Sequence, residues 1–203
     1  MKESVIVVYK YVPLCGATII STQWIVTASH CFLDEDKRNL KVIIGANNIN
    51  HQDRIVSDIE DAIQYPKLSM DPLVTNDIAL TKLTSSLPLS SKTKPVRLPK
   101  LGDDSSGVAI TSGFGATAVE SSKMSEHLMW ISVKIFDGSE CASRYRYRGK
   151  TTFDNAQMIC AGAKYGQTTC VDDSGGPLVQ KLNGEDTLIG NTSFGPRGCD
   201  QQG

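Results

Sequence analysis

Short apolar runs rich in β-branched residues recur along the chain, and polar stretches with Gly, Asn, Asp and Ser separate them. This pattern is typical of β-strands that bury at least one face and are joined by turns. No long apolar stripe with the helical period appears. Only residues 139–145 are expected to form a short helix, which Asp137 or Ser139 can cap. The pattern predicts an all-β protein. The expected strands lie at residues 5–8, 19–27, 42–44, 78–83, 108–111, 130–136, 178–181 and 188–194.

A polar stretch that contains Pro95 and Pro99 divides these strands into two groups of similar extent. Clustered Ser, Thr, Lys and Pro between apolar runs are typical of a connecting segment. We therefore expect one domain over residues 1–203. Within it, residues 1–91 and 108–203 each form a β half, and residues 92–107 connect them.

The composition is that of a globular protein, with 40% apolar and 21% charged residues. The 21 Lys and Arg residues nearly balance the 22 Asp and Glu residues, which gives a net charge of −1. This balance argues against nucleic acid or an anionic membrane as an electrostatic partner. No run approaches the roughly 20 apolar residues of a membrane-spanning helix, so no membrane partner is expected.

The six cysteines are widely separated, and no pair has the two-residue spacing of a zinc knuckle or a redox site. Only three histidines are present to complete a metal site, so we expect no metal and no cofactor. Six free thiols in the cytosol and three disulfides in an oxidising compartment are the two alternatives. The even number favours disulfides and hence a secreted, extracellular protein, although no secretory signal is visible at the N-terminus.

Three separated segments each offer one member of a nucleophile, base and orienting-acid set. His30 follows the apolar run at residues 24–28, and Asp77 precedes the run at residues 78–80. Ser174 lies in the Gly-rich segment Cys-Val-Asp-Asp-Ser-Gly-Gly-Pro-Leu at residues 170–178. Each residue alone has an ordinary structural explanation. Their occurrence together points to nucleophilic catalysis by a serine hydroxyl.

The order of these three segments resembles that of the chymotrypsin/trypsin-like serine peptidases, and the resemblance covers nearly all of the chain. It implies two six-stranded antiparallel β-barrels with the active site between them, the second barrel being incomplete here. It also implies the disulfides Cys15–Cys31, Cys141–Cys160 and Cys170–Cys199. Further matching motifs are Cys15-Gly16, Ser112-Gly113-Phe114-Gly115, Met158-Ile159-Cys160-Ala161-Gly162 and Ser193-Phe194-Gly195.

The resemblance assigns a role to each member of the set. Ser174 attacks the scissile carbonyl, His30 takes its proton and passes it to the leaving amine, and Asp77 orients the imidazole. The backbone amides of Asp172 and Ser174 form the oxyanion hole. Because the imidazole must start neutral, activity is expected to fall as the pH drops below about 6.5–7. The partners are a protein or peptide substrate and protein protease inhibitors, and the protein is expected to be a monomer.

The resemblance also places the residues that select the substrate. Thr168 corresponds to the base of the pocket for P1, the substrate side chain before the scissile bond. Trypsin-like enzymes have an aspartate there, and Thr168 is neutral. Ser193, Phe194 and Gly195 form the strand that pairs with the substrate, and Gly195 leaves the pocket mouth open. The expected preference is for a non-basic, chymotrypsin-like P1 side chain.

The sequence departs from the family pattern in three places. Asp172 replaces the oxyanion-hole glycine, where a carboxylate repels the developing negative charge. The Ile-Val-Gly-Gly type segment, whose freed amine pairs with the aspartate before the nucleophile (here Asp173), is absent. The chain stops four residues after Cys199, so we expect it to be truncated at both ends. The alternatives to an active peptidase are therefore a catalytically impaired homologue that binds a partner, and a fragment without a function of its own.

Overall fold

The computed structural model describes residues 4–9, 12–33, 36–71, 74–117, 124–147, 150–151, 153–163 and 168–195. Strands dominate both halves of the chain, and the predicted all-β fold class is confirmed. In chain order the elements are β1 (Ser4–Tyr9), β2 (Val12–Ile19), β3 (Trp24–Thr27), the 3-10 helices η1 (Ser29–Phe32) and η2 (Lys37–Asn39), β4 (Leu40–Ile44), β5 (Ile55–Gln64), β6 (Ala79–Leu83), β7 (Val108–Gly113), β8 (Met129–Ile135), α1 (Gly138–Arg144), β9 (Arg146–Tyr147), β10 (Lys150–Thr151), β11 (Ala161–Gly162), β12 (Pro177–Leu182) and β13 (Glu185–Asn191).

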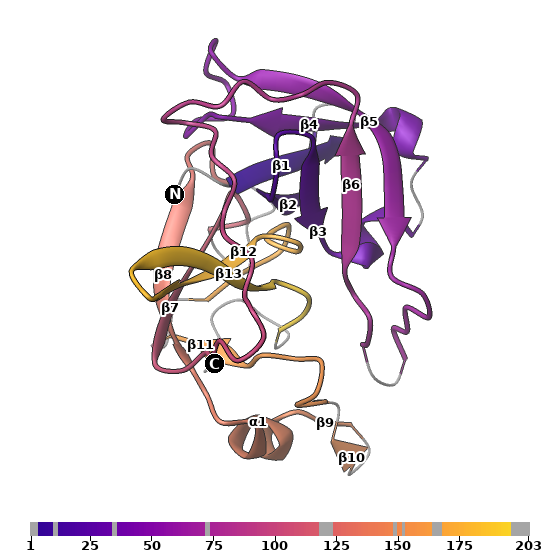
Figure 1. The fold of residues 1–203 in the computed structure, drawn as a ribbon. Helices are drawn as coiled ribbons and strands as arrows, with labels where there is room; N and C mark the ends of the chain where they lie inside the picture. The colour runs from indigo at the N-terminus through magenta and orange to yellow at the C-terminus, as the bar shows by residue number, and fades with distance from the viewer. Residues whose placement is uncertain are drawn as a thin grey trace.

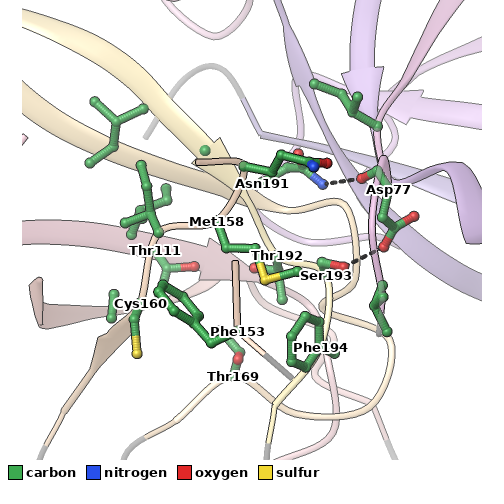
Figure 2. A pocket seen from close by; sticks show the side chains of 18 of the residues that line it. Asp77, Thr111, Phe153, Met158, Cys160, Thr169, Asn191, Thr192, Ser193 and Phe194 are labelled. Atoms are coloured by element: carbon green, nitrogen blue, oxygen red, sulfur yellow. Dashed lines mark hydrogen bonds between the residues drawn. The ribbon is translucent and has the colours of Figure 1, made fainter. Parts of the chain in front are cut away.

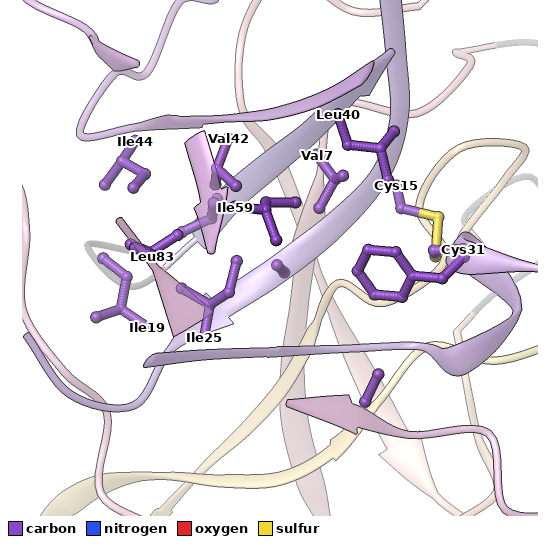
Figure 3. Close-up of a cluster of buried hydrophobic side chains, with 14 of the residues drawn as sticks. Val7, Cys15, Ile19, Ile25, Cys31, Leu40, Val42, Ile44, Ile59 and Leu83 are labelled. Atoms are coloured by element: carbon purple, nitrogen blue, oxygen red, sulfur yellow. A yellow bond between two sulfur atoms is a disulfide. The ribbon is translucent and has the colours of Figure 1, made fainter. Parts of the chain in front are cut away.

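The first six strands close into an antiparallel barrel in the order β1-β2-β3-β6-β5-β4, at the top of the view in Figure 1. Alternate residues of each strand point inward, as Leu40, Val42 and Ile44 do in β4. Figure 3 shows these side chains meeting those of the facing strands in the barrel core. Closure pairs every strand on both sides and leaves no free sheet edge in this half.

The second half contains a five-stranded sheet in the order β11-β8-β7-β12-β13, and β9 pairs with β10 beside it. These are the strands that the structure describes for the second expected barrel. Figure 1 shows the five-stranded sheet on the left, with β9 and β10 at the bottom, beyond α1. The helix α1 begins where expected, because the Asp137 carboxylate accepts a hydrogen bond of 2.8 Å from the Ser139 amide. No helix in the described residues is long and apolar enough to cross a membrane.

The two halves share a small apolar cluster to which the connecting segment contributes. Val26 of β3 packs with Val179 of β12 and Leu188 of β13, and Val96 of the connector lies among them. The Val96 amide donates to the carbonyl of Ile19 at 2.9 Å. The segment expected as a connector is thus a packed part of the junction between the barrel and the second sheet.

The strand expected over residues 19–27 is wrong in its extent, because only Ile19 lies in β2 and a turn separates it from β3, which begins at Trp24. The Ser21 hydroxyl accepts hydrogen bonds from the amides of Gln23 and Trp24, at 3.3 and 3.0 Å. A serine that satisfies amides two and three residues ahead stabilises a turn in place of an extended chain. The polar residues 21–23 carried this signal inside an otherwise apolar run.

Candidate active site

His30 and Asp77 are brought together by the pairing of two neighbouring strands. β3 and β6 run antiparallel, with Thr27 opposite Ala79. His30 follows the end of β3, and Asp77 precedes the start of β6. Because the end of one antiparallel strand lies beside the start of its neighbour, both residues come to the same end of the barrel.

The His30 and Asp77 side chains make a short contact that is largely buried. His30 Nδ1 lies 2.8 Å from Asp77 Oδ2, and the exposed fractions of the two side chains are 21% and 4%. The His30 backbone amide donates to Asp77 Oδ1 at 2.9 Å. The Ser193 hydroxyl also donates to Asp77 Oδ2. Asp77 therefore holds the ring at Nδ1 and leaves Nε2 on the opposite side of the imidazole.

Burial and hydrogen bonding act on the Asp77 carboxyl in opposite directions. Burial raises its pKa, but the hydrogen bonds from His30 and Ser193 together lower it further than burial raises it. The net pKa of Asp77 lies below the ordinary value, so the group is a carboxylate at neutral pH. A buried anion next to Nδ1 stabilises an imidazolium that forms during proton transfer.

Ser174 lies in a turn that packs closely against the β3 side of the barrel. Gly175 has φ of +79°, and a Cβ there would lie 2.1 Å from Thr27 Oγ1 and 2.9 Å from the amide nitrogen of Ala28. Only glycine permits both this conformation and this approach. The Gly16 amide donates to the Ser174 carbonyl at 2.7 Å, which fixes the turn to β2. The turn that carries Ser174 is thereby held against Thr27 and Ala28, which directly precede the turn of His30.

No hydrogen bond joins His30 Nε2 to Ser174 Oγ within the described residues. Such bonds are often long before substrate binds and tighten only in the complex. The disulfide Cys15–Cys31, with an S–S distance of 2.02 Å, ties the turn of His30 to β2. The same strand holds Ser174 through Gly16, so His30 and Ser174 share one rigid support.

The structure places the second disulfide between Cys141 and Cys160, joining α1 to the segment before β11. Cys170 is also disulfide-bonded, and its expected partner Cys199 lies outside the described residues. Cys15, His30 and Cys31 lie close enough to suggest a metal site, but both cysteines are oxidised and offer no thiolate.

Asp172 adopts a backbone conformation that favours glycine, with φ of +70°. Aspartate is among the few other residues that visit this left-handed region. The amides of Asp172 and Ser174 donate to no acceptor in the described part of the chain, so both can serve an oxyanion. Burial raises the pKa of the Asp172 carboxyl, and the charge of Asp173 raises it further.

The Asp173 carboxylate is buried against the Gly113–Gly115 segment. Its Oδ1 accepts from the Gly115 amide and its Oδ2 from the Cys170 amide, both at 2.9 Å. A Cβ at Gly113 would lie 1.9 Å from Asp173 Oδ1, so the glycine makes room for the carboxylate. Burial raises the pKa of Asp173, and these two amides offset part of the effect. No ion pair to Asp173 forms among the described residues.

A cavity of about 680 Å³ opens beside Asp77. Three of the four residues predicted to bind substrate, Thr168, Ser193 and Phe194, line it. Gly195 is not a lining residue, and the space around it is open. Phe153 lies in the lining beside Cys160, as Figure 2 shows, and Tyr145 packs edge-on against Phe194 with ring centroids 5.7 Å apart. Apart from Asp77, the described side chains of the lining are uncharged.

Two polar residues near Asp77 were missed by sequence reasoning. The Asn191 side-chain amide donates to the Asp77 carbonyl at 3.3 Å, and the Ser29 hydroxyl donates to the Ile78 carbonyl at 2.6 Å. Ser29 is fully buried beside His30. In the sequence, each of the two appears only as a polar side chain next to an apolar run. Such a pattern does not indicate which group the side chain will bond to.

The comparisons with known proteins agree with this architecture. A family model described as Trypsin matches residues 4–203. Trypsin-1 of Astacus astacus is 32% identical over 195 residues, which cover 93% of this chain and 79% of that protein. Kallikrein-8 of Mus musculus is 33% identical over 190 residues, covering 92% and 68%. The solved structure of neuropsin, a serine protease expressed in the limbic system of mouse brain, matches with a TM-score of 0.83 and 27% identity, covering 99% of this chain and 85% of that one. This chain belongs to the trypsin family of serine peptidases.

Proposed function

We propose that the protein is a serine endopeptidase that works through Ser174, His30 and Asp77 and an acyl-enzyme. The observation that carries the proposal is the 2.8 Å contact between His30 Nδ1 and the buried Asp77 carboxylate. It holds the imidazole with Nε2 free to accept the Ser174 proton. The amides of Asp172 and Ser174 then receive the oxyanion. Proteins or peptides are the substrates, and protein protease inhibitors are candidate partners of the same cleft.

We further propose that the protein acts outside the cell as a monomer. Five of its six cysteines are disulfide-bonded in the described residues, which fits an oxidising compartment. The substrate reaches the triad along residues 193–195, which pair with it as an added strand.

The proposed reaction is tested by labelling the naturally produced protein with a fluorophosphonate probe and mapping the adduct by peptide mass. We expect the adduct on Ser174, because only an activated serine beside a working oxyanion site reacts at an appreciable rate. Ser174→Ala and His30→Ala variants serve as negative controls, and an active serine peptidase is labelled in parallel. A protein that stays unlabelled while the parallel enzyme reacts would be the binding homologue instead.

The binding homologue is the second candidate because of one observation. The Asp172 carboxylate, on a residue with φ of +70°, lies at the position that contributes an oxyanion amide. A negative charge there opposes the negative charge of the transition state. A chain that had lost catalysis in this way would retain the cleft and bind a protein partner without cleaving it.

The cavity favours an uncharged P1 side chain. Among its described lining residues the one charged group is Asp77, which is 4% exposed and already bonded to His30 and Ser193. An arginine or lysine entering this cavity would lose its hydration without gaining a countercharge. Thr168, at the expected pocket base, offers a hydroxyl only.

We therefore expect kcat/KM to be at least about tenfold higher for Phe or Leu than for Arg at P1, a difference of about 1.4 kcal/mol or more. The measurement uses ester substrates that differ only at P1. A Thr168→Asp variant should move the ratio toward Arg, while Thr22→Asp, on an exposed turn of the barrel, should leave it unchanged. A preference for Arg in the unaltered protein would contradict the assignment of Thr168.

A further inference from the structure

The last residue of β13 and the segment that follows it contact Asp77 twice. The Ser193 hydroxyl donates to the Asp77 carboxylate, and the Asn191 amide donates to the Asp77 backbone carbonyl at 3.3 Å. Figure 2 shows both side chains directed at Asp77. Asn191 is half-buried and lines the cavity. One contact fixes the carboxylate and the other fixes the peptide that follows Asp77.

The segment before Asp77 holds one side of that peptide group, because the Ile78 amide donates to the Asn76 carbonyl at 3.0 Å. Asn76 has φ of +59°, and its side-chain amide donates to the carbonyl of Lys67, which has φ of +66°. Non-glycine residues in this region cost on the order of 1 kcal/mol each and persist where surrounding contacts hold them. The bond from Asn191 is one such contact, and it comes from the other half of the molecule.

The same strand end also holds the turn of the nucleophile. The Gly175 amide donates to the Thr192 carbonyl at 2.6 Å, and the Thr192 amide donates to the Gly176 carbonyl at 2.8 Å. Residues 191–193 therefore bond to the Ser174 turn through their backbone and to Asp77 through their side chains. Asn191 therefore belongs to a segment that links Asp77 to the turn that carries Ser174.

We infer that Asn191 is a positioning residue, whose side-chain amide holds the Asp77 peptide, and through it the His30 ring, in register with the Ser174 turn. This inference rests on the proposed function for its kinetic consequence alone. A substitution far from the reacting atoms can lower kcat by about 10²-fold if it misplaces a reacting group by about 1 Å. Losing one of several contacts on Asp77 is expected to cost about tenfold in kcat with little change in KM.

The test compares Asn191→Leu with a matched control, Gln23→Leu. Gln23 Nε2 also donates to a backbone carbonyl, that of Leu83, at 3.0 Å, and Gln23 is likewise half-buried but lies away from the cavity. Both variants lose one amide-to-carbonyl hydrogen bond, so both are expected to lose similar stability. Only Asn191→Leu should lower kcat. The proteins are made in a host that attaches no N-glycans, because residues 191–193 also form a glycosylation sequon.

A second readout needs no turnover: the proton NMR signal of His30 Nδ1–H. Asn191→Leu should shift or broaden this signal, and Gln23→Leu should leave it in place. Asn191→Asp, which puts an acceptor opposite the Asp77 carbonyl, should perturb it more and decides the matter if the Leu variant does not fold. If the parent is active and both Asn191 substitutions leave kcat and the proton signal unchanged, the inference is overturned. If the parent shows no hydrolysis, the proposed function fails, and the proton signal alone decides the role of Asn191.

Discussion

Replacing Asp77 by Asn is expected to lower kcat by about 10⁴-fold, the loss typical of this exchange in Ser-His-Asp triads. The amide oxygen can keep the bond from the His30 backbone amide. The amide NH₂ then replaces Oδ2, which accepts from Nδ1 in the parent. A donor facing Nδ1 forces the ring into the tautomer that carries its proton on Nε2. That nitrogen can no longer take the proton of Ser174.

The measurement is kcat and KM for an ester substrate, with fluorophosphonate labelling of Ser174 followed in parallel. KM should stay within about a factor of three, because Asp77 acts through His30 and does not bind the substrate. Asp61→Asn is the matched control, since Asp61 is an exposed carboxylate of the same barrel and pairs with Lys37 at 2.7 Å. A variant that kept more than about a tenth of the parental kcat would remove Asp77 from the mechanism.

The pattern of apolar residues predicts most of the longer strands because each of these strands carries a run of apolar residues. β5 was missed for a physical reason. Its inward residues Ser57 and Ile59 alternate with the outward Asp58 and Glu60, so no apolar run appears. Strict alternation is itself a strand signal, but a serine on the inward side weakens it. The barrel supplies the missing apolar contacts from neighbouring strands, which sequence alone does not place.

The sequence names the candidate site residues but not their contacts. His30, Asp77 and Ser174 were predicted from the motifs around them and from the resemblance that those motifs carry. The contact of Asn191 with the Asp77 carbonyl depends on how β13 crosses from the second sheet to the barrel, across 114 positions of sequence. That contact follows from tertiary packing and leaves no local pattern.

Replacing Asp172 by Gly is expected to raise kcat by about 10- to 100-fold. The backbone already has φ of +70°, and the amide is unbonded within the described residues, so it is free to donate to an oxyanion in the parent. What remains is the carboxylate charge. Two unit charges about 6 Å apart repel by about 3 kcal/mol at an effective dielectric constant of about 20. That repulsion is present in the transition state and absent in the uncharged ground state of the substrate, so it lowers kcat.

Three substitutions separate charge from conformation. Asn keeps the size of Asp172 and tolerates the left-handed region, Gly removes both the charge and the backbone strain, and Ala removes the charge but keeps the strain. If charge is the obstacle, Asn should recover nearly all of the gain seen with Gly, and Ala somewhat less. A gain with Gly alone would identify the strained backbone as the obstacle instead. Three unchanged rates would show that Asp172 does not limit catalysis.

Salt provides an independent check on the same explanation. The Asp172 side chain is partly exposed, so its field is screened by ions, with a Debye length of about 10 Å at 0.1 M and about 3 Å at 1 M. The kcat of the parent should therefore rise with ionic strength, and that of Asp172→Asn should not. Because Thr168, Ser193 and Phe194 lie in the cavity and not in the oxyanion turn, KM should be similar for all variants. If the charge of Asp172 lowers kcat without raising KM, the protein is a slow peptidase that binds its substrate well. The active enzyme and the binding homologue would then differ by a single carboxylate.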